Sequence, residues 1–244
     1  MVSRDSVVLG VSRFCSGGFF LRYDSIVNMS GFLQTSASLL LVFTIVRVAW
    51  FVFGRHMSKG LLFRHTYKFL VVLGSGGHTS EMLIMLKQFR DRMERIELHF
   101  IVADSDTTSV ARIAAVLGDD VPYKVIRIPR LRHVGESFIK AVIRLPKIIL
   151  LNLVIVFRAD PDVILVNGPG TCIPTVVSAC LIQIFSPTFK RIFCVFVESF
   201  CRVKTISMTG KLLYPLVDKF IVQWEPTAEV LRRFPKIIYK GSVL

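Results

Sequence analysis

Residues 68–83 read KFLVVLGSGGHTSEML, and this stretch decides how the chain folds. The apolar, β-branched run 69–73 predicts a buried strand. Three glycines follow within the four positions 74–77, and apolar residues then recur at helical spacing over residues 78–93. A strand that turns through glycines into a helix places free N–H groups of the helix N-terminus at the strand end. Such a unit suits a phosphate or diphosphate ligand.

The same alternation of strand and helix continues to the C-terminus. Further strands are expected at 96–103, 123–128, 163–166, 192–197, 220–223 and 237–239. Further helices are expected at 108–117, 136–158 with a kink at Pro146, 171–185, 210–217 and 227–234. Continuous apolar strands separated by helices predict an α/β fold with a Rossmann-like parallel sheet covered on both faces. Ligands of such sheets bind at the carboxyl ends of the strands.

The first glycine-rich loop has two interpretations. The residues that would cradle a diphosphate are Gly74, Ser75, Gly76, Gly77, His78 and Thr79. His78 is then a candidate general base, or a candidate hydrogen-bond donor to a phosphate oxygen. In the structural alternative the glycines only turn the chain, and Thr79 or Ser80 caps the helix. The loop is neither a GxGxxG fingerprint, because His78 fills the last position, nor a Walker loop, because no GK[ST] follows.

Two other strand ends carry segments of similar character. After the strand 163–166 the chain reads NGPGT, and the candidate diphosphate ligands there are Asn167, Gly168, Gly170 and Thr171. The alternative is a turn in which Thr171 caps a helix. Glu198 follows the strand 192–197 and is a candidate catalytic carboxylate, unless it simply pairs with Arg202.

Composition limits the class of protein. The chain has 244 residues, a mean hydropathy of +0.58, 52% hydrophobic residues and a net charge of +14. Disorder is excluded, and a membrane-associated protein with a phosphate-bearing partner, nucleic acid or anionic lipid, is favoured. The five cysteines are scattered, with no CxxC and no zinc spacing, so we expect reduced thiols, no metal and no cofactor.

One segment, residues 32–53, is long and apolar enough to cross a bilayer. Residues 54–68 contain four Lys or Arg and no acid, whereas residues 17–31 contain only Arg22, so the C-terminal side is expected in the cytosol. A cleaved signal peptide is the alternative. The predicted division is a lumenal extension 1–31 (with Met29 as a possible start), a transmembrane helix 32–53, a basic linker 54–67 and a cytosolic domain 68–244.

A basic set lies beside an apolar run in the middle of the chain. Its members are Arg127, Arg130, Arg132, His133, Lys140, Arg144 and Lys147. The apolar run 148–157 is too short to span a membrane. A basic helix with an apolar face fits insertion into an anionic leaflet, and a buried core helix is the alternative. Nucleic acid is disfavoured, because no zinc finger or RNP motif is present.

Taken together, these motifs resemble a known family. They are VVLGSGGHTSEML at 71–83, IPRLRHVGES at 128–137, DPDVILVNGPGTCIP at 160–174 and the segment 196–224 that begins FVESFCRVK. In this order, and after an N-terminal span, they resemble the membrane-anchor subunit of the two-subunit UDP-N-acetylglucosamine transferase of asparagine-linked glycosylation. The chain is also similar, more distantly, to the acceptor half of MurG, the bacterial transferase that forms lipid II.

The resemblance implies one half of a GT-B glycosyltransferase on the cytosolic face of the endoplasmic reticulum. A separate soluble subunit would bind UDP-GlcNAc, and the pair would add the second GlcNAc to GlcNAc-diphosphate-dolichol. The implied partners are this subunit, membrane lipid, the dolichol-linked acceptor and the enzyme of the preceding step. The chain alone would be inactive. A pure scaffold that only recruits the partner is the alternative.

The resemblance also assigns residues by position. The two glycine loops and Glu198 would line the acceptor cleft, with Pro169 beside it. The tail residues Gly241, Ser242, Val243 and Leu244 would dock on the partner. The chain departs from the family pattern at Glu136, where glutamine is expected, and in its long segment before Met29.

Overall fold

The computed structural model describes residues 16–57, 66–88, 96–118, 121–131, 135–185, 190–226, 228–239 and 241. The chain divides into two compact units, Met1–Gly54 and Arg55–Leu244.

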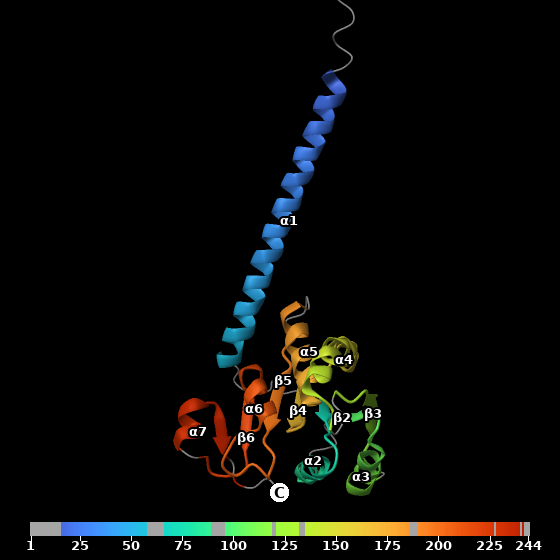
Figure 1. The fold of residues 1–244 in the computed structure, drawn as a ribbon, viewed down its shortest axis with the longest axis vertical. Coiled ribbons are helices and arrows are strands. Elements are labelled where there is room, and N and C mark those ends of the chain that lie inside the picture. The colour runs from blue at the N-terminus through green and yellow to red at the C-terminus, as the bar shows by residue number, and fades with distance from the viewer. Residues whose placement is uncertain are drawn as a thin grey trace, which may run out of the picture. The chain divides into compact units, whose positions relative to one another are not determined.

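The first unit is built on one long helix, α1 (Ser16–Met57; Figure 1). Within it, Phe32–Phe53 is long and apolar enough to cross a membrane, as predicted from the sequence. The helix begins well upstream of the predicted span. Hydroxyl groups inside this segment donate to carbonyls one turn earlier, as from Ser36 to Phe32 and from Thr44 to Leu40. Such bonds satisfy hydroxyl donors that would otherwise face hydrocarbon.

The single charge in the predicted span, Arg47, is placed among aromatic rings of its own helix. Its guanidinium carbon lies 6.0 Å from the ring centre of Phe43 and 5.3 Å from that of Trp50. Cation–π contacts of this kind partly offset the cost of a charge in an apolar segment.

The second unit contains a parallel sheet. In the described residues seven strands pair in the order β3-β2-β1-β4-β5-β6-β7, and every pair is parallel. The strands are β1 (Tyr67–Val72), β2 (Ile96–Ala103), β3 (Tyr123–Ile128), β4 (Val163–Asn167), β5 (Phe193–Val197), β6 (Lys219–Val222) and β7 (Ile237–Tyr239). The predicted α/β class and parallel sheet are therefore confirmed, with strand ends shifted by two residues at most.

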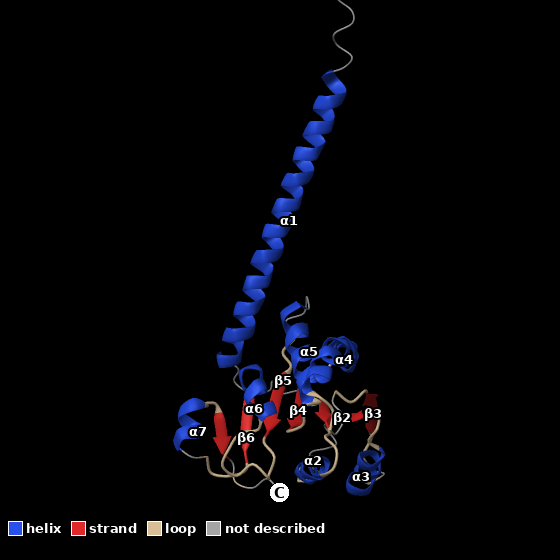
Figure 2. Cartoon of the chain, viewed as in Figure 1, coloured by secondary structure: helices blue, strands red, loops and turns tan. Residues whose placement is uncertain are grey.

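The strand order reverses between β1 and β4, and this reversal decides which face each helix covers. The helices are α2 (Gly77–Lys87), α3 (Thr107–Leu117), α4 (Phe138–Ala159), α5 (Cys172–Phe185), α6 (Met208–Leu213) and α7 (Ala228–Arg233). Right-handed crossovers place α2 and α3 on one face and α4, α5 and α6 on the other (Figures 1 and 2). The reversal creates a crevice at the carboxyl edge, between the loops that follow β1 and β4.

Three helix predictions need correction. The predicted helix 210–217 is the short helix α6 followed by a 3₁₀ turn, Tyr214–Leu216, because Pro215 has no N–H to continue α-helical bonding. Helix α4 begins at Phe138 and not at 136, because Gly135 adopts a φ of +78° and Ser137 precedes the helix as its N-cap. Helix α2 ends at Lys87, and the predicted continuation beyond 88 lies outside the described residues.

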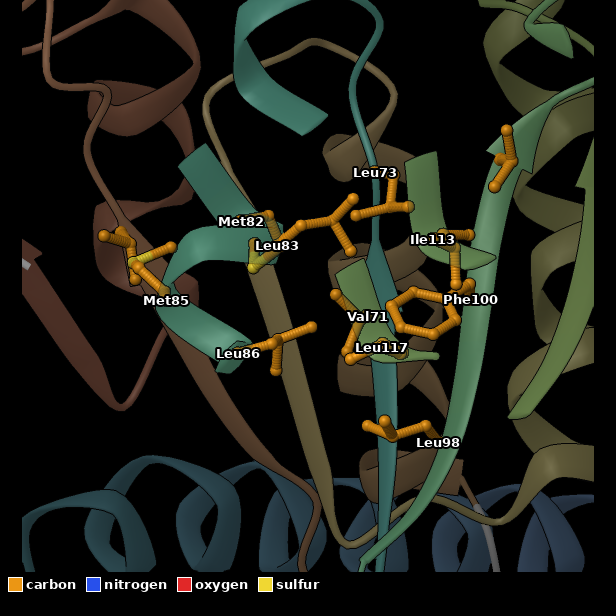
Figure 3. Close-up of a cluster of buried hydrophobic side chains, with 12 residues drawn as sticks. Val71, Leu73, Met82, Leu83, Met85, Leu86, Leu98, Phe100, Ile113 and Leu117 are labelled. Carbon is orange, nitrogen blue, oxygen red and sulfur yellow. The ribbon is translucent and has the colours of Figure 1, made fainter. Parts of the chain in front are cut away.

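The hydrophobic core on the first face joins the sheet to α2 and α3 (Figure 3). Val71 and Phe100 project from β1 and β2 toward Met82 and Ile113 of the two helices, and none of these four side chains is exposed. Their burial fixes the direction of α2, and therefore the place of the loop before it.

On the opposite face, α4 and α5 are joined by a buried polar pair. The hydroxyl of Thr175 donates to Asn152 Oδ1 at 2.8 Å, and Asn152 Nδ2 donates to the Ile148 carbonyl at 2.9 Å. Both side chains are fully buried, so the pair fixes how the two helices face each other.

Candidate functional site

Loops that follow β1, β4 and β5 meet at the carboxyl edge of the sheet and enclose a cleft of about 440 Å³. Its lining residues are Gly77, His78, Glu81, Gly168, Glu198, Ser199, Cys201, Arg202, Ser207, Met208 and Thr209. The structure thus brings together the three segments that the sequence placed at one edge.

The two glycine loops are in direct contact, and glycine is required for it. A Cβ on Gly74 would lie 2.5 Å from Pro169 Cγ, and a Cβ on Gly168 would lie 2.7 Å from His78 Cε1. Gly168 and Gly76 also have a φ of +68°, which other residues rarely adopt. By contrast, a Cβ on Gly77 or Gly170 would meet nothing within 4 Å. Gly77 therefore offers an open backbone surface to the cleft.

The prediction that Thr79 or Ser80 caps α2 is wrong. The N-cap is Gly76, which has no side chain to satisfy the first N–H groups of the helix. Thr79 lies inside the helix, where its hydroxyl bonds the Gly74 carbonyl and, at 2.7 Å, Ser109 Oγ of α3. Ser80 Oγ accepts from Arg112 at 2.9 Å. The N-terminal N–H groups of α2 are consequently left for a ligand.

A buried network anchors this loop to α3. Asp106, the N-cap of α3, accepts from the Ser109 N–H at 3.0 Å and from the Ser109 hydroxyl at 2.6 Å, and Ser109 contacts Thr79. Burial would raise the pKa of Asp106, but the hydrogen bonds from Ser109 and Thr108 outweigh it and hold that pKa below its usual value. The charged carboxylate therefore holds the end of α3 against the glycine loop.

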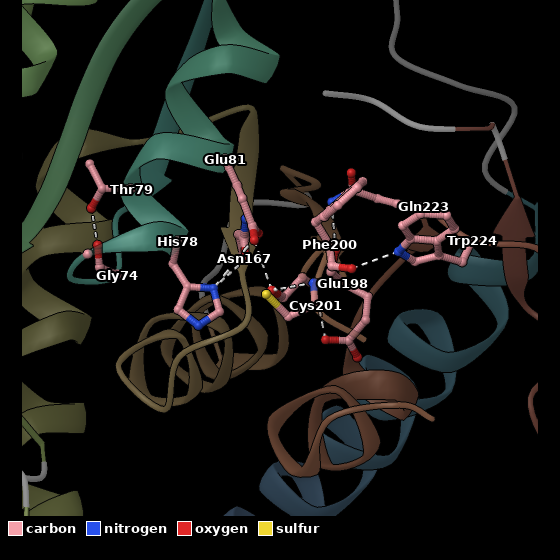
Figure 4. A network of polar contacts seen from close by, with 12 residues as sticks. Gly74, His78, Thr79, Glu81, Asn167, Glu198, Phe200, Cys201, Gln223 and Trp224 are labelled. Carbon is pink, nitrogen blue, oxygen red and sulfur yellow. Dashed lines mark hydrogen bonds and ion pairs between the residues drawn. The ribbon is translucent and has the colours of Figure 1, made fainter. Parts of the chain in front are cut away.

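A second network orients His78 (Figure 4). Asn167 Nδ2 donates to Glu81 Oε2 at 3.0 Å, so the Asn167 oxygen faces His78 Nδ1 at 3.1 Å. Because that oxygen can only accept, Nδ1 carries the proton in the neutral ring and Nε2 carries a lone pair. The side chain of His78 is 34% exposed in the cleft. In that tautomer Nε2 is the ring nitrogen that can accept a proton.

Glu81 is the hub of this network, and the sequence did not single it out. Its other oxygen accepts from Ser199 Oγ at 3.0 Å, so one buried carboxylate joins the loops after β1, β4 and β5. The sequence held one signal for Glu81: it follows His78 by three residues on a predicted helix, so the two side chains lie on the same side of that helix. Its partners are 86 and 118 positions away, which no local pattern reveals.

Glu198 does not form the predicted pair with Arg202, and that alternative is wrong. Its carboxylate accepts from two backbone N–H groups, those of Ser199 at 3.1 Å and Ser207 at 2.8 Å. A Cβ on Gly210 would lie 2.8 Å from Glu198 Oε2, so α6 approaches the carboxylate closely. Glu198 thereby shapes the loop 199–207, which carries Arg202. Apart from His78, Arg202 is the one cationic side chain among the described residues that line the cleft.

The remaining predicted site residues are placed as follows. The Thr171 hydroxyl is buried and finds no hydrogen-bond partner among the described residues, so the prediction that it caps α5 is wrong. Gly241 adopts a φ of +78° after β7. The predicted tail residues Ser242, Val243 and Leu244 lie outside the described residues, as do Arg132 and His133 of the basic set.

Helix α4 has both a buried and an exposed apolar face. Neither the predicted core helix nor the predicted membrane-surface helix describes it completely. Ala141, Ile148 and Val156 are buried against the rest of the domain. Along the other face the exposed fractions are 69% for Ile139, 72% for Ile143, 64% for Leu150, 48% for Val154 and 70% for Phe157. Large exposed apolar stripes of this kind mark surfaces that bind a membrane or a partner.

Among the four cysteines that the structure describes, Cys201 is expected to react with thiol reagents and the other three are not. Cys201 is exposed in the cleft, whereas Cys172, Cys180 and Cys194 are buried. Burial raises the pKa of the Cys172 thiol to about 12, which leaves on the order of 10⁻⁴ of it as thiolate at pH 8. N-ethylmaleimide should modify Cys201 at least about 100-fold faster than Cys172, as measured by peptide mass spectrometry. All the thiols should react in the unfolded chain, and equal rates in the folded chain would contradict the placement.

Known proteins share both the sequence and the fold. A family model described as "Oligosaccharide biosynthesis protein Alg14 like" matches residues 69–243. The human "UDP-N-acetylglucosamine transferase subunit ALG14" is 37% identical over 221 residues, which cover 87% of this chain and 97% of the human one. The subunit of the same name from Schizosaccharomyces pombe is 37% identical over 171 residues, covering 67% of this chain and 79% of that protein.

A solved structure supports the fold prediction. MurG of Acinetobacter baumannii superposes with a TM-score of 0.50 at 12% identity, over 72% of this chain and 45% of MurG. This chain therefore spans less than half the length of MurG. The predicted fold class, one half of a GT-B glycosyltransferase, is confirmed, and so is the family resemblance.

Proposed function

The chain belongs to the Alg14 family of oligosaccharide biosynthesis proteins, and we propose that it is the acceptor-binding, membrane-anchored subunit of a two-subunit UDP-GlcNAc transferase. A separate soluble subunit binds UDP-GlcNAc and is recruited by this chain to the cytosolic face of the endoplasmic reticulum. The pair adds the second GlcNAc to GlcNAc-diphosphate-dolichol. The names of the relatives support its assignment as a subunit. The direct contact between the two glycine loops, at the point where the strand order reverses, is the observation that supports the acceptor site.

The cleft has the groups that a lipid diphosphate needs. Uncapped N–H groups at the start of α2 and the open backbone at Gly77 suit phosphate oxygens. Arg202 lines the opposite wall and supplies positive charge. In this proposal Gly74, Gly76 and Gly168 hold the loops close together, and Asn167 orients His78.

The proposed chemistry is transfer of a sugar to an acceptor hydroxyl. The hydroxyl oxygen bonds to C1 of GlcNAc, the bond from C1 to the UDP oxygen breaks, and the hydroxyl proton passes to a base. His78 Nε2 is the proposed base, since Asn167 occupies Nδ1 and the residue lines the cleft. Glu198 supports the wall that carries Arg202. UDP leaves on the partner subunit.

Membrane placement follows from two features. The apolar segment Phe32–Phe53 anchors the chain, with the basic linker 54–67 on the cytosolic side. The exposed apolar stripe of α4 then lies against the bilayer surface, beside the cations Lys140, Arg144 and Lys147. An acceptor that never leaves the bilayer requires such an arrangement.

Substitution of Gly77 by valine tests acceptor binding against a purely scaffolding role. The new side chain has free space in the fold, so it should protrude into the cleft and leave the domain intact. In the reconstituted pair we expect the KM for the lipid acceptor to rise at least about tenfold, the cost of losing a phosphate contact. The KM for UDP-GlcNAc and co-purification of the soluble subunit should not change.

Thr107→Val is the matched control, because Thr107 occupies the first position of α3 outside the cleft and is exposed. It should leave both KM values unchanged within about twofold. If Gly77→Val also leaves the acceptor KM unchanged while the partner still binds, the chain is a scaffold and the acceptor site is wrong.

Deletion of residues 241–244 tests recruitment. If the tail docks on the soluble subunit, the truncated chain should lose co-purification by at least about tenfold and lose transferase activity in proportion. Its melting temperature should stay within about 2 °C of the full chain, because the tail lies after the last strand. Undiminished recovery of the partner would contradict docking through the tail.

A further inference from the structure

A second pocket lies between the ends of β2 and β3 and the first half of α4, and it shares no lining residue with the cleft. Its volume is about 410 Å³. Three cationic side chains line it, Arg130, Arg144 and Lys147, against a single acid, Asp104. An excess of positive charge inside a concave site indicates an anionic ligand.

Two of the three cations are available to such a ligand. Arg144 is paired with Glu136, at 2.7 Å between Nη1 and Oε2. Arg130 and Lys147 form no hydrogen bond or ion pair with any residue of the described part of the chain, although Arg130 lies close enough to the Asp106 carboxylate to help lower its pKa. Both residues line the pocket, Arg130 as a half-buried side chain and Lys147 as an exposed one. A guanidinium can bind a phosphate through two parallel hydrogen bonds, and a lysine ammonium binds it as a point charge.

The rest of the pocket wall is apolar and continues into the exposed stripe of α4. Ile148 is buried at the base of the pocket, and Leu151 is 38% exposed beside it. The exposed side chains Ile143 and Leu150 lie one position from Arg144 and Leu151 along the helix. A small water-soluble anion would make no use of these apolar neighbours, whereas a lipid would place its headgroup on the cations and its chains along the stripe.

We propose that this pocket binds the phosphate of an anionic phospholipid, with Arg130 and Lys147 as the phosphate ligands and Ile143 and Leu150 beside the acyl chains. The site is separate from the acceptor cleft. It rests on the proposed placement of α4 at the membrane surface and adds a specific lipid contact to it. A headgroup held at α4 would fix the rotation of the domain on the bilayer, and thereby the direction in which the cleft opens.

The test uses the full chain in non-ionic detergent micelles, titrated with dioctanoyl phosphatidylserine, dioctanoyl phosphatidylcholine or inorganic phosphate and followed by native mass spectrometry. We expect phosphatidylserine to bind at least about tenfold more tightly than phosphatidylcholine, and inorganic phosphate to bind more weakly than either. The variant Arg130→Gln/Lys147→Gln should weaken phosphatidylserine binding about tenfold or more, because two charged contacts are lost.

The matched control is Arg158→Gln/Lys211→Gln, which removes the same charge from exposed positions of α4 and α6 that do not line the pocket. It should change phosphatidylserine binding less than about twofold. Equal weakening by both double variants would show non-specific attraction and overturn the site. So would inorganic phosphate that binds as tightly as the lipid.

Failure of this proposal is distinguishable from failure of the proposed function. The Gly77→Val chain should bind phosphatidylserine as the unmodified chain does, whatever happens to its acceptor KM. If Arg130→Gln/Lys147→Gln raises the acceptor KM in micelles without phospholipid, the pocket belongs to the acceptor site and the separate lipid site is wrong.

Discussion

Replacing His78 by alanine is expected to lower the turnover number of the reconstituted transferase by about 10²–10⁴-fold, the range in which positioned general bases contribute. Asn167 contacts Nδ1 of the ring and His78 lines the cleft, so the substitution removes the proposed proton acceptor, Nε2. The imidazole is about one-third exposed and lies outside the hydrophobic core, so the fold should persist. Initial rates at saturating UDP-GlcNAc and acceptor measure the effect.

Two further variants separate catalysis from phosphate binding. If His78 is the base, kcat falls and the acceptor KM changes much less, and His78→Gln does not restore the rate. If His78 only donates to a phosphate, the acceptor KM rises and glutamine recovers much of the binding. His99→Gln is the control, because His99 lies on β2 and pairs with Glu97 away from the cleft. A kcat for His78→Ala within about threefold of the unmodified pair would remove His78 from the mechanism.

Much of the fold follows from local sequence, because the inner strands of a doubly covered parallel sheet are apolar along most of their length. The inner strands 163–167 and 193–197 are predicted to within one residue for this reason, and the strands 96–103 and 123–128 are predicted to the residue although charged side chains interrupt them. Ligands of parallel sheets bind at the carboxyl edge, which predicts that the loops after β1 and β4 lie together there. The structure shows this contact between Gly74 and Pro169.

What the sequence missed depends on contacts between distant segments. Thr79 resembles a helix cap, yet its hydroxyl bonds Ser109, 30 positions away, because α2 and α3 pack on the same face of the sheet. Glu198 resembles half of an ion pair with Arg202, yet the loop closes over it and offers the N–H of Ser207 instead. Hydrophobic periodicity predicts which face of a helix is buried. It does not predict which side chain of a distant segment packs against that face.

The largest stability effect is expected from Glu81→Leu. The substitution leaves Asn167 Nδ2 and Ser199 Oγ without their buried acceptor, and each unpaired donor costs about 1–3 kcal/mol. The free energy of unfolding should fall by about 2–5 kcal/mol, and the melting temperature of the full chain in micelles by about 5–15 °C. Glu81→Gln keeps one carbonyl acceptor and should lose less.

Glu97→Leu is the matched control, since Glu97 pairs with Lys124 and His99 near the surface of β2. Lys124 and His99 hold the pKa of Glu97 below its usual value, yet the exposed Glu97–Lys124 pair contributes less than about 1 kcal/mol, and only the ring of His99 is left with a buried unpaired group. If Glu81→Leu is no more destabilising than Glu97→Leu, Glu81 does not hold the three loops together.

Glu81→Leu should also reduce catalysis beyond its effect on stability. Without Glu81 the Asn167 amide is free to turn its NH₂ toward His78, and Nδ1 must then accept, so the proton moves to Nε2. The proposed base is then blocked, and kcat should fall at least about tenfold at a temperature where the variant is fully folded. A folded Glu81→Leu chain with undiminished kcat would show that the Glu81–Asn167–His78 chain does not set the protonation of His78.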